Sequence, residues 1–95
     1  MSETYTNITP YRARELTELH KDWEPIVQKE LDERVSDAVA RGKDNTQLVF
    51  TTERDVGMTP EMNKVIEDIL IKKGWTIKEH AWNSASRVCR IEIEW

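Results

Sequence analysis

The chain ends in a run, residues 87–95, in which apolar and polar side chains alternate. From position 89 onward the apolar residues occupy every second place: Cys89, Ile91, Ile93 and Trp95. The positions between them hold Arg90, Glu92 and Glu94. A period of two predicts a β-strand with one buried face and one solvated face. Because a strand at the end of a chain frays unless it is paired, this run requires a sheet with one covered face.

Two earlier segments also predict strands. Residues 46–52 are rich in β-branched and aromatic side chains and are too short for a helix. Residues 75–82 form a second such run, and the polar residues 83–86 separate it from the closing strand. A four-residue polar turn between two strands predicts a β-hairpin.

The ends of two helices are marked by proline and glycine. Thr9-Pro10 and Thr59-Pro60 each combine a good N-cap residue with a proline suited to the first helical turn. Gly42 and Gly74 are suited to the C-terminal caps. The sequence therefore predicts helices that begin at Pro10 and Pro60.

Both helices carry an apolar stripe at helical spacing. In the first helix the stripe consists of Leu16, Leu19, Trp23, Ile26, Val27, Leu31, Val35, Ala38 and Val39. In the second it consists of Met62, Val65, Ile66, Ile69 and Leu70. Pro25 interrupts the first stripe and allows two interpretations. Either the helix kinks at Trp23-Glu24, or Asp22 caps a second helix that has Pro25 in its first turn.

The predicted fold class is α+β, with the order helix (kinked or double), strand, helix, strand, strand. The strand-helix-strand unit should be right-handed. Since the closing strand has one dry face, both helical stripes should pack on that face, which gives a two-layer sandwich with a three-stranded mixed sheet. Residues 1–9 should form an N-terminal arm, and residues 10–95 a single domain.

Composition favours an ordinary soluble domain. The chain has 95 residues, of which 38% are hydrophobic and 34% are charged. No apolar run approaches the roughly 20 residues of a membrane span, and the start of the chain lacks the features of a secretory signal. We therefore expect the protein in the cytoplasm. Its formal net charge of −4 disfavours non-specific binding to nucleic acid.

The residues that commonly carry chemistry are few and scattered. The chain has one cysteine and two histidines, His20 and His80. Cys89 shares the dry face of the closing strand, which predicts a buried structural thiol. His80 has the parity of Thr76, Lys78 and Trp82 and is therefore expected on the open face of the sheet. These positions match no zinc spacing, nucleophile elbow or phosphate loop, so we predict no enzyme activity, no cofactor and no metal.

Exposed tryptophan and the long first helix point to protein contacts. Trp75 should lie in the core and Trp95 in the core or at the sheet edge, whereas the parity of Trp82 places it opposite the core. Trp82 is then either an interface anchor or a residue covered by Arg87 or a loop. A helix of about thirty residues reaches roughly 45 Å, well beyond a small sheet, so residues 10–24 should project or fold back at Pro25. The candidate interface residues are Leu16, Leu19, Trp23, Trp82, Arg87 and Arg90.

A second function is compatible with the same fold. The open sheet face should carry basic and aromatic side chains that could hold single-stranded nucleic acid or a nucleotide, namely Lys78, His80, Trp82, Arg87 and Arg90. Three carboxylates, Glu79, Glu92 and Glu94, lie nearby and weaken this alternative.

Several short motifs suggest a relationship with known proteins. They are the run 38–43, the helix start Thr59-Pro60-Glu61, the helix end 70–77 and the final Ile-x-Trp. In these motifs, residues 26–95 resemble small uncharacterised proteins of tailed bacteriophages. The resemblance carries over no functional residue. It implies a phage-encoded chain that acts by binding, as a virion component or as an inhibitor or sequesterer of host machinery.

Together these observations predict a non-enzymatic interaction protein. We expect it to form a homo-oligomer, to bind a protein partner, and to act in the host cytoplasm or in the virion. We expect no membrane contact.

Overall fold

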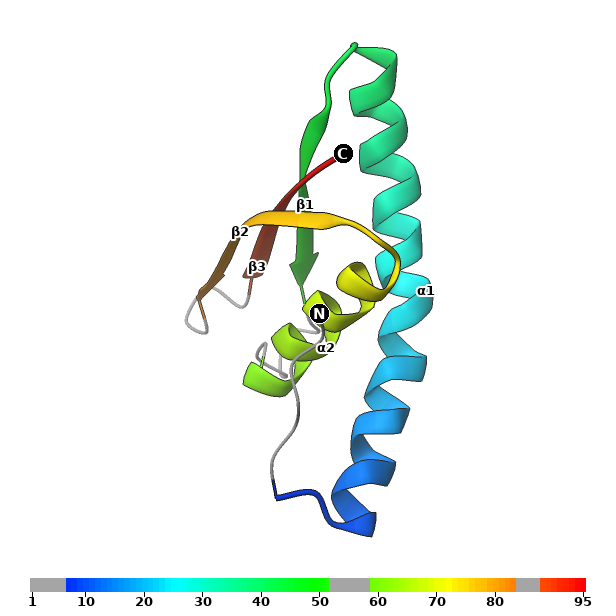
Figure 1. Ribbon diagram of the computed structural model, residues 1–95, viewed down its shortest axis with the longest axis vertical. Helices are drawn as coiled ribbons and strands as arrows, with labels where there is room; N and C mark the ends of the chain where they lie inside the picture. Colours follow the sequence, from blue (N-terminus) through cyan, green and yellow to red (C-terminus); the bar gives the residue numbers. More distant parts are fainter. Residues whose placement is uncertain (1–6, 52–58, 84–87) are drawn as a thin grey trace.

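The computed structural model describes residues 7–51, 59–83 and 88–95, and the side chains of all of these except residues 82 and 83. The described elements are α1 (Pro10–Ala40), β1 (Asn45–Thr51), α2 (Pro60–Lys72), β2 (Thr76–Asn83) and β3 (Val88–Glu94), as Figure 1 shows. Two helices and a three-stranded antiparallel sheet confirm the α+β class.

Both helices begin as the sequence predicts. The hydroxyl oxygen of Thr9 accepts a hydrogen bond from the backbone N–H of Arg12 at 3.1 Å. The hydroxyl oxygen of Thr59 accepts one from Met62 at 3.2 Å. Each bond satisfies a backbone donor that the first helical turn leaves without a partner.

Both helices end at the predicted glycines. Gly42 and Gly74 have φ values of +73° and +91°, a region that L side chains rarely adopt. Beyond Gly74, the backbone N–H of Trp75 bonds to the carbonyl of Leu70 at 3.1 Å. The same pattern closes α1 beyond Gly42, so both helices end in a Schellman motif.

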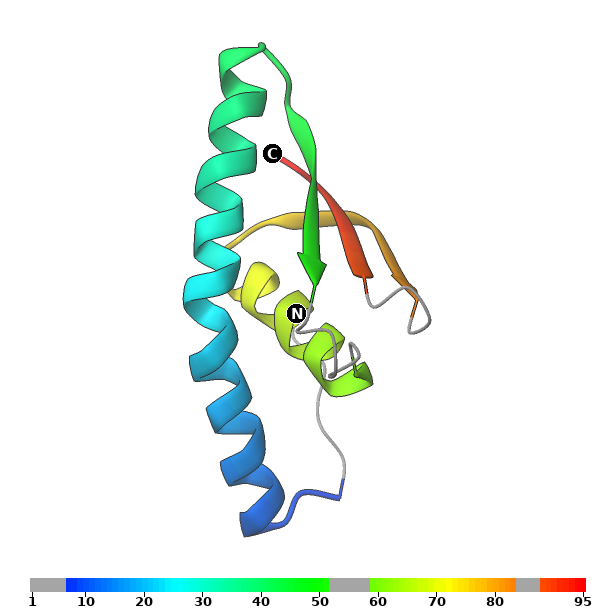
Figure 2. The same cartoon turned by 180° about the vertical axis from the view of Figure 1, so that it is seen from behind.

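Pro25 neither ends nor divides the first helix. α1 continues through it for 31 residues, so the alternative of a second helix capped by Asp22 is wrong. Figures 1 and 2 show no sharp bend along α1. Trp23 and Val27 are buried on either side of the exposed proline. Their packing holds the helix together where the local sequence would interrupt it.

The sheet has the strand order β1-β3-β2, and both neighbouring pairs are antiparallel. The prediction of a mixed sheet is therefore wrong. The hairpin places β3 between β1 and β2, so the two strands joined through α2 run in the same direction without touching. The strand bounds differ from the predicted ones by about one residue, which is usual for strand ends.

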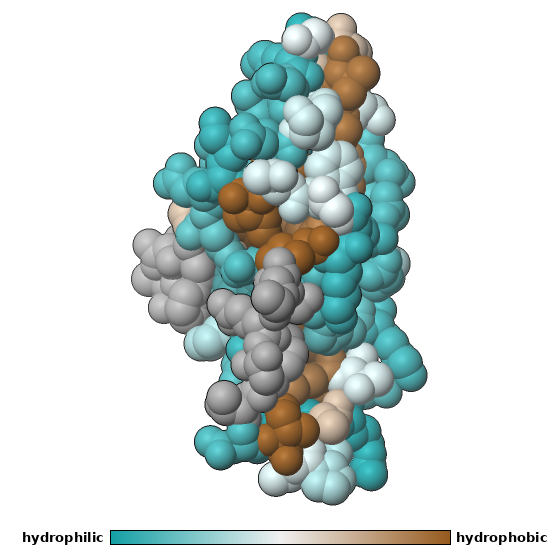
Figure 3. Space-filling view, in the orientation of Figure 1, coloured by the Kyte–Doolittle hydropathy of each residue, from teal (hydrophilic) through white to brown (hydrophobic). Residues whose placement is uncertain are grey.

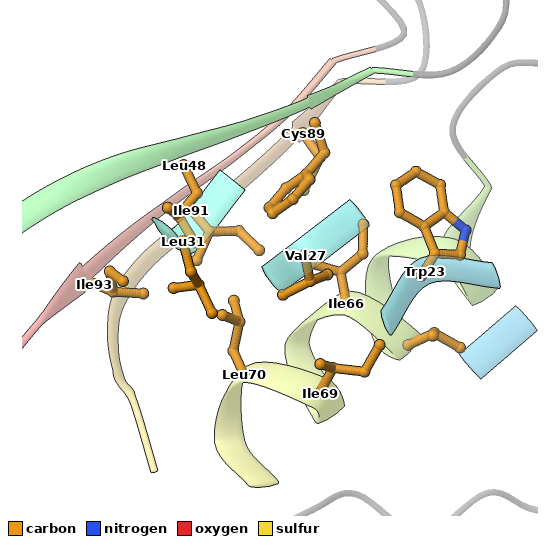
Figure 4. Close-up of a cluster of buried hydrophobic side chains, with 12 residues drawn as sticks. Trp23, Val27, Leu31, Leu48, Ile66, Ile69, Leu70, Cys89, Ile91 and Ile93 are labelled. Atoms are coloured by element: carbon orange, nitrogen blue, oxygen red, sulfur yellow. The ribbon is translucent and has the colours of Figure 1, made fainter. Parts of the chain in front are cut away.

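The core is formed by side chains of both helices and of strands β1 and β3. Figure 4 shows Leu48, Cys89, Ile91 and Ile93 of the sheet facing side chains of α1 and α2. The buried cluster contains Trp23, Val27, Leu31, Leu48, Phe50, Val65, Ile66, Ile69, Leu70, Cys89, Ile91 and Ile93. Most of both predicted stripes is thus confirmed as core.

Three residues of the predicted apolar stripes and of the dry strand face are exposed. Ile26 and Val39 were assigned to the α1 stripe but are 47% and 57% exposed, because they lie at its margins, away from α2 and the sheet. Trp95 is 44% exposed at the end of β3. Its ring meets the half-buried ring of Trp75 edge to face, with centroids 5.8 Å apart. Trp95 therefore lies just beyond the end of the central strand β3 and not in the core.

A bulge in β2 changes which side chains face the helices. The register with β3 shifts between Ile77, which pairs with Ile93, and Glu79. His80 consequently pairs with Ile91, a fully buried residue. Directly paired residues share a face, so His80 lies on the covered face and its predicted place on the open face is wrong. The same shift removes the parity argument that placed Trp82 on the open face.

The first helix determines the length of the molecule. Its 31 residues span about 46 Å at 1.5 Å per residue, and the longest dimension of the chain is 45 Å. Figures 1 and 2 show its N-terminal part, in blue, extending beyond the strands. Among the described residues, no helix combines the length and the apolar character that crossing a membrane requires.

Candidate functional site

A polar cluster lies beneath the sheet, around the imidazole of His80. Its Nδ1 atom lies 3.1 Å from a carboxylate oxygen of Glu67. Its Nε2 atom lies 3.0 Å from Oδ1 of Asn63 and 3.2 Å from Sγ of Cys89. The cluster therefore joins α2, β2 and β3. Asn63 and Glu67 are one helical turn apart, which places both on the face of α2 that meets β2.

The cluster has the composition of a nucleophilic site but not its accessibility. A cysteine, a histidine and a carboxylate in hydrogen-bonded order can activate a thiol for catalysis. Cys89, however, is 0% exposed. Burial, with a smaller contribution from the charge of Glu67, raises the pKa of the thiol to about 12. A reactive cysteine needs a thiolate that a substrate can reach, so the geometry supports the predicted structural thiol.

Hydrogen bonds fix the orientation of this cluster. The amide nitrogen of Asn63 donates to the carbonyl oxygen of Thr59 at 3.0 Å, so the amide oxygen is turned toward His80. His80 therefore has an acceptor facing each ring nitrogen, and it ties α2 to the hairpin. Within the residues that the structure describes, no three His, Cys, Asp or Glu side chains lie where they could hold a metal ion.

The N-terminal half of α1 is bound to α2 by two polar contacts. Arg12 pairs with Glu61 at 3.0 Å, close to where both helices begin. The pKa of Glu61 is lowered mainly by backbone hydrogen bonding, and the Arg12 guanidinium lowers it further. Eight positions farther along α1, Nε2 of His20 lies 3.1 Å from the buried carboxylate of Asp68.

A third contact lies near the end of α2. The ammonium group of Lys73 lies 2.7 Å from Glu24 and donates to the side-chain oxygen of Gln28 at 2.8 Å. Residue numbers rise together on both helices along this series of contacts, so α1 and α2 run in the same general direction. Residues 10–24 therefore pack along α2, although they extend beyond the sheet.

The predicted interface residues are not brought together. Leu16 and Trp23 are 5% and 6% exposed, and the Trp23 ring meets Phe50 edge to face. Because both pack within the chain, neither offers a surface to a partner in this fold. Leu19 is half-buried at the margin of the core, and Arg90 is exposed.

The remaining two predicted interface residues cannot be placed. The side chain of Trp82 and the whole of Arg87 lie outside the described residues. The structure therefore gives neither of them a place in a site.

The outer side of α1 carries a shallow groove that was not predicted from the sequence. It has a volume of about 340 Å³. Its lining comprises Tyr11, Arg14, Glu15, Glu18, Leu19 and Asp22. Tyr11 is 72% exposed, the largest exposed fraction of any large hydrophobic side chain that the structure describes. The signal in the sequence was the position of Tyr11, which lies off the apolar stripe of its helix.

A second hollow, of about 240 Å³, lies at the opposite end of α1. It is lined mainly by polar and charged residues, including Asp37, Arg41, Lys43 and Glu92. Arg41 already pairs with Asp37 at 3.3 Å. None of the polar side chains that the structure describes in this lining is buried, so they do not form a built binding site.

Comparison with known proteins gives no relative for this chain. No family model, no curated protein and no solved structure matches it.

Proposed function

We propose that this protein acts by binding another protein and not by catalysis, and that its contact surface is the outer side of α1 over residues 11–22. The observation that carries the proposal is the exposed ring of Tyr11 beside the groove. Tyrosine is one of the residue types that are enriched at protein–protein interfaces and contribute most of the binding energy.

The polar cluster supports the non-enzymatic part of the proposal. Among the described residues, one histidine lies within hydrogen-bond distance of both a carboxylate and a thiol. It is His80, which contacts Glu67 and Cys89. The thiol at the end of that order is fully buried, and burial holds its pKa far above neutral. These groups account for packing between α2 and the hairpin.

We further propose a two-layer arrangement, in which both helices cover the same face of the sheet. The other face is then open, and it is the surface on which the alternative function, nucleic-acid binding, depends. Lys78 on that face lies 3.9 Å from Glu92 and 3.8 Å from Glu94. Its charge is thus offset by two carboxylates. A phosphate backbone would meet a mixed surface there, so no observation favours this alternative.

Self-association is the second part of the proposal. Within the described residues, the outer edge of β2 has no partner strand. A bulge and the adjacent charged residues Lys78 and Glu79 lie on this strand, and such features deter pairing with another strand. We therefore assign the homo-oligomer contact to the α1 surface.

The resemblance to phage proteins supports a biological setting for this activity. It implies a phage-encoded chain that either binds host machinery or contributes to the virion. Both roles require a protein contact surface, and neither requires a catalytic centre.

The test is the mass in solution of the wild type and of Tyr11→Glu. Light scattering should give the wild type a mass above the 11.2 kDa of one chain. It should give the variant a mass close to that value. Leu16→Glu would place a charge in the core and unfold the chain, whereas Tyr11 is exposed and its substitution should leave the fold intact. A wild type that remains monomeric at high micromolar concentration would refute the homo-oligomer.

A further inference from the structure

The groove on α1 combines an apolar floor with an acidic rim. Tyr11, Glu15, Glu18 and Asp22 follow one another at intervals of four, three and four residues. Helical geometry places residues at these intervals on one face. Leu19 lies next to this row and adds aliphatic surface to the groove.

Counted over the residues that line the groove, carboxylates outnumber cationic groups. Glu15, Glu18 and Asp22 contribute three carboxylates, and Arg14 contributes one guanidinium. Among the contacts of the described residues, Glu15 pairs with Arg12 at 2.6 Å and Glu18 pairs with Lys21 at 3.8 Å. The four side chains are 33–70% exposed. Exposed pairs of this kind hold their partners weakly. A stronger cationic partner can therefore displace them.

We propose that the groove accepts a basic amphipathic helix of a partner protein. An arginine or lysine side chain has an apolar stem and a cationic head. The apolar stem would pack against Tyr11 and Leu19, and the cationic head would pair with the carboxylates of the rim. The Tyr11 ring also offers a face for a cation–π contact. Carboxylates at positions 15, 18 and 22 repeat at intervals of three and four residues, which a helix with cations at the same spacing can follow.

This inference rests on the proposed contact surface and adds the chemistry of its partner. A general attraction between a basic peptide and a chain of net charge −4 would also give binding. The experiment must therefore separate a local site from net charge.

The probe is a fluorescent peptide with lysine and leucine at helical spacing, compared with the same peptide carrying glutamate in place of lysine. Fluorescence anisotropy should show binding of the basic peptide and none of the acidic one. The double variant Glu18→Lys/Asp22→Lys should weaken binding by about tenfold or more, since two charge contacts are reversed.

The matched control is Asp32→Lys/Glu33→Lys, which makes the same change in net charge at exposed positions farther along α1. It should weaken binding by about twofold at most, because the separation exceeds the screening length in physiological salt. Tyr11→Ala leaves the net charge unchanged and should weaken binding several-fold. Circular dichroism on each variant checks that the fold is retained.

Two results would overturn the inference. One is an equal loss of binding in the two double variants, which would show attraction by net charge alone. The other is unchanged binding in Tyr11→Ala.

Light scattering on the same samples separates this inference from the proposed function. A monomer that binds the peptide through Tyr11 supports the inference and refutes the homo-oligomer. An oligomer that binds no peptide, and that Tyr11→Glu dissociates, shows that a second copy occupies the groove and refutes the basic partner.

Discussion

A carboxylate oxygen of Glu30 accepts a hydrogen bond from the backbone N–H of Val49 at 2.8 Å. The contact joins the middle of α1 to the outer edge of β1. The same carboxylate also accepts a hydrogen bond from the guanidinium of Arg34 at 3.2 Å. An edge strand presents backbone donors that can pair with other chains. α1 satisfies one of these donors, so this edge of the sheet is protected by the protein's own helix.

Glu30→Ala should lower the free energy of unfolding by about 1–3 kcal/mol, because the side chain is only 14% exposed and its loss leaves the Val49 donor without its acceptor. Glu30→Gln keeps an oxygen in place and should cost less. Urea denaturation measures both. Glu33→Ala, at an exposed position of the same helix, is the control and should change stability by less than about 0.5 kcal/mol. Equal losses for Glu30→Ala and Glu33→Ala would contradict the role assigned to this contact.

Gly42→Ala and Gly74→Ala should each cost about 1–2 kcal/mol through backbone strain alone. Both glycines have positive φ, and a methyl group at either position would meet no atom within 4 Å. The two sites lie in different helix ends, so the losses should add. Asparagine tolerates this backbone region better than alanine, and Gly42→Asn should therefore be milder than Gly42→Ala. The measurement is thermal or urea denaturation. A Gly42→Asn variant that is less stable than Gly42→Ala would contradict this reasoning.

Pro25→Ala should raise the free energy of unfolding by about 2 kcal/mol. Alanine is favoured over proline in a helix interior by about 3 kcal/mol, and part of this is offset by the greater freedom of the unfolded chain. Pro25 is exposed and α1 is continuous around it, so the substitution should disturb no packing. A loss of stability in urea denaturation would mean that the proline sets the shape of α1. Ile26→Ala, at the neighbouring exposed position, provides the comparison.

Alkaline pH should destabilise the wild type more steeply than Cys89→Ala. Burial, with a smaller effect of the Glu67 charge, raises the pKa of the Cys89 thiol from 9.0 to about 12. Between these values the folded chain retains a proton that the unfolded chain releases. The free energy of unfolding therefore falls as pH rises through this window, by at most about 1.4 kcal/mol per pH unit from this group.

The same thiol gives no pH dependence near neutrality, where it is protonated in both states. The measurement is urea denaturation at a series of pH values from neutral to strongly alkaline. Parallel curves for the wild type and Cys89→Ala would contradict the raised pKa.

The features that local sequence controls were predicted well. Thr9, Thr59, Gly42 and Gly74 act within one helical turn of their own position, and the structure uses each of them as predicted. The alternation in the closing strand likewise identified Cys89, Ile91 and Ile93 as buried, because a period of two leaves little choice of face. It failed at Trp95, which lies beyond the last paired residue of the strand.

The features that depend on distant contacts were not predicted. One bulge in β2 reversed the side assigned to His80, and nothing in residues 76–80 signals an extra residue. The cluster with Asn63 and Glu67 was missed for that reason. Leu16 and Trp23 were assigned to a partner because the helix is longer than the sheet, whereas α2 covers the part that extends beyond it. The length of a helix shows how far it reaches but not which neighbouring element covers it.

The central claim is that residues 11–22 of α1 form the surface through which copies of this protein contact one another. The most direct test is to record ¹H–¹⁵N spectra of the wild type from low micromolar to millimolar concentration and to map which amides shift. The account predicts shifts concentrated at Tyr11, Glu15, Glu18, Leu19 and Asp22, and their absence in Tyr11→Glu. Shifts centred on the strands, or a spectrum that does not change with concentration, would contradict it.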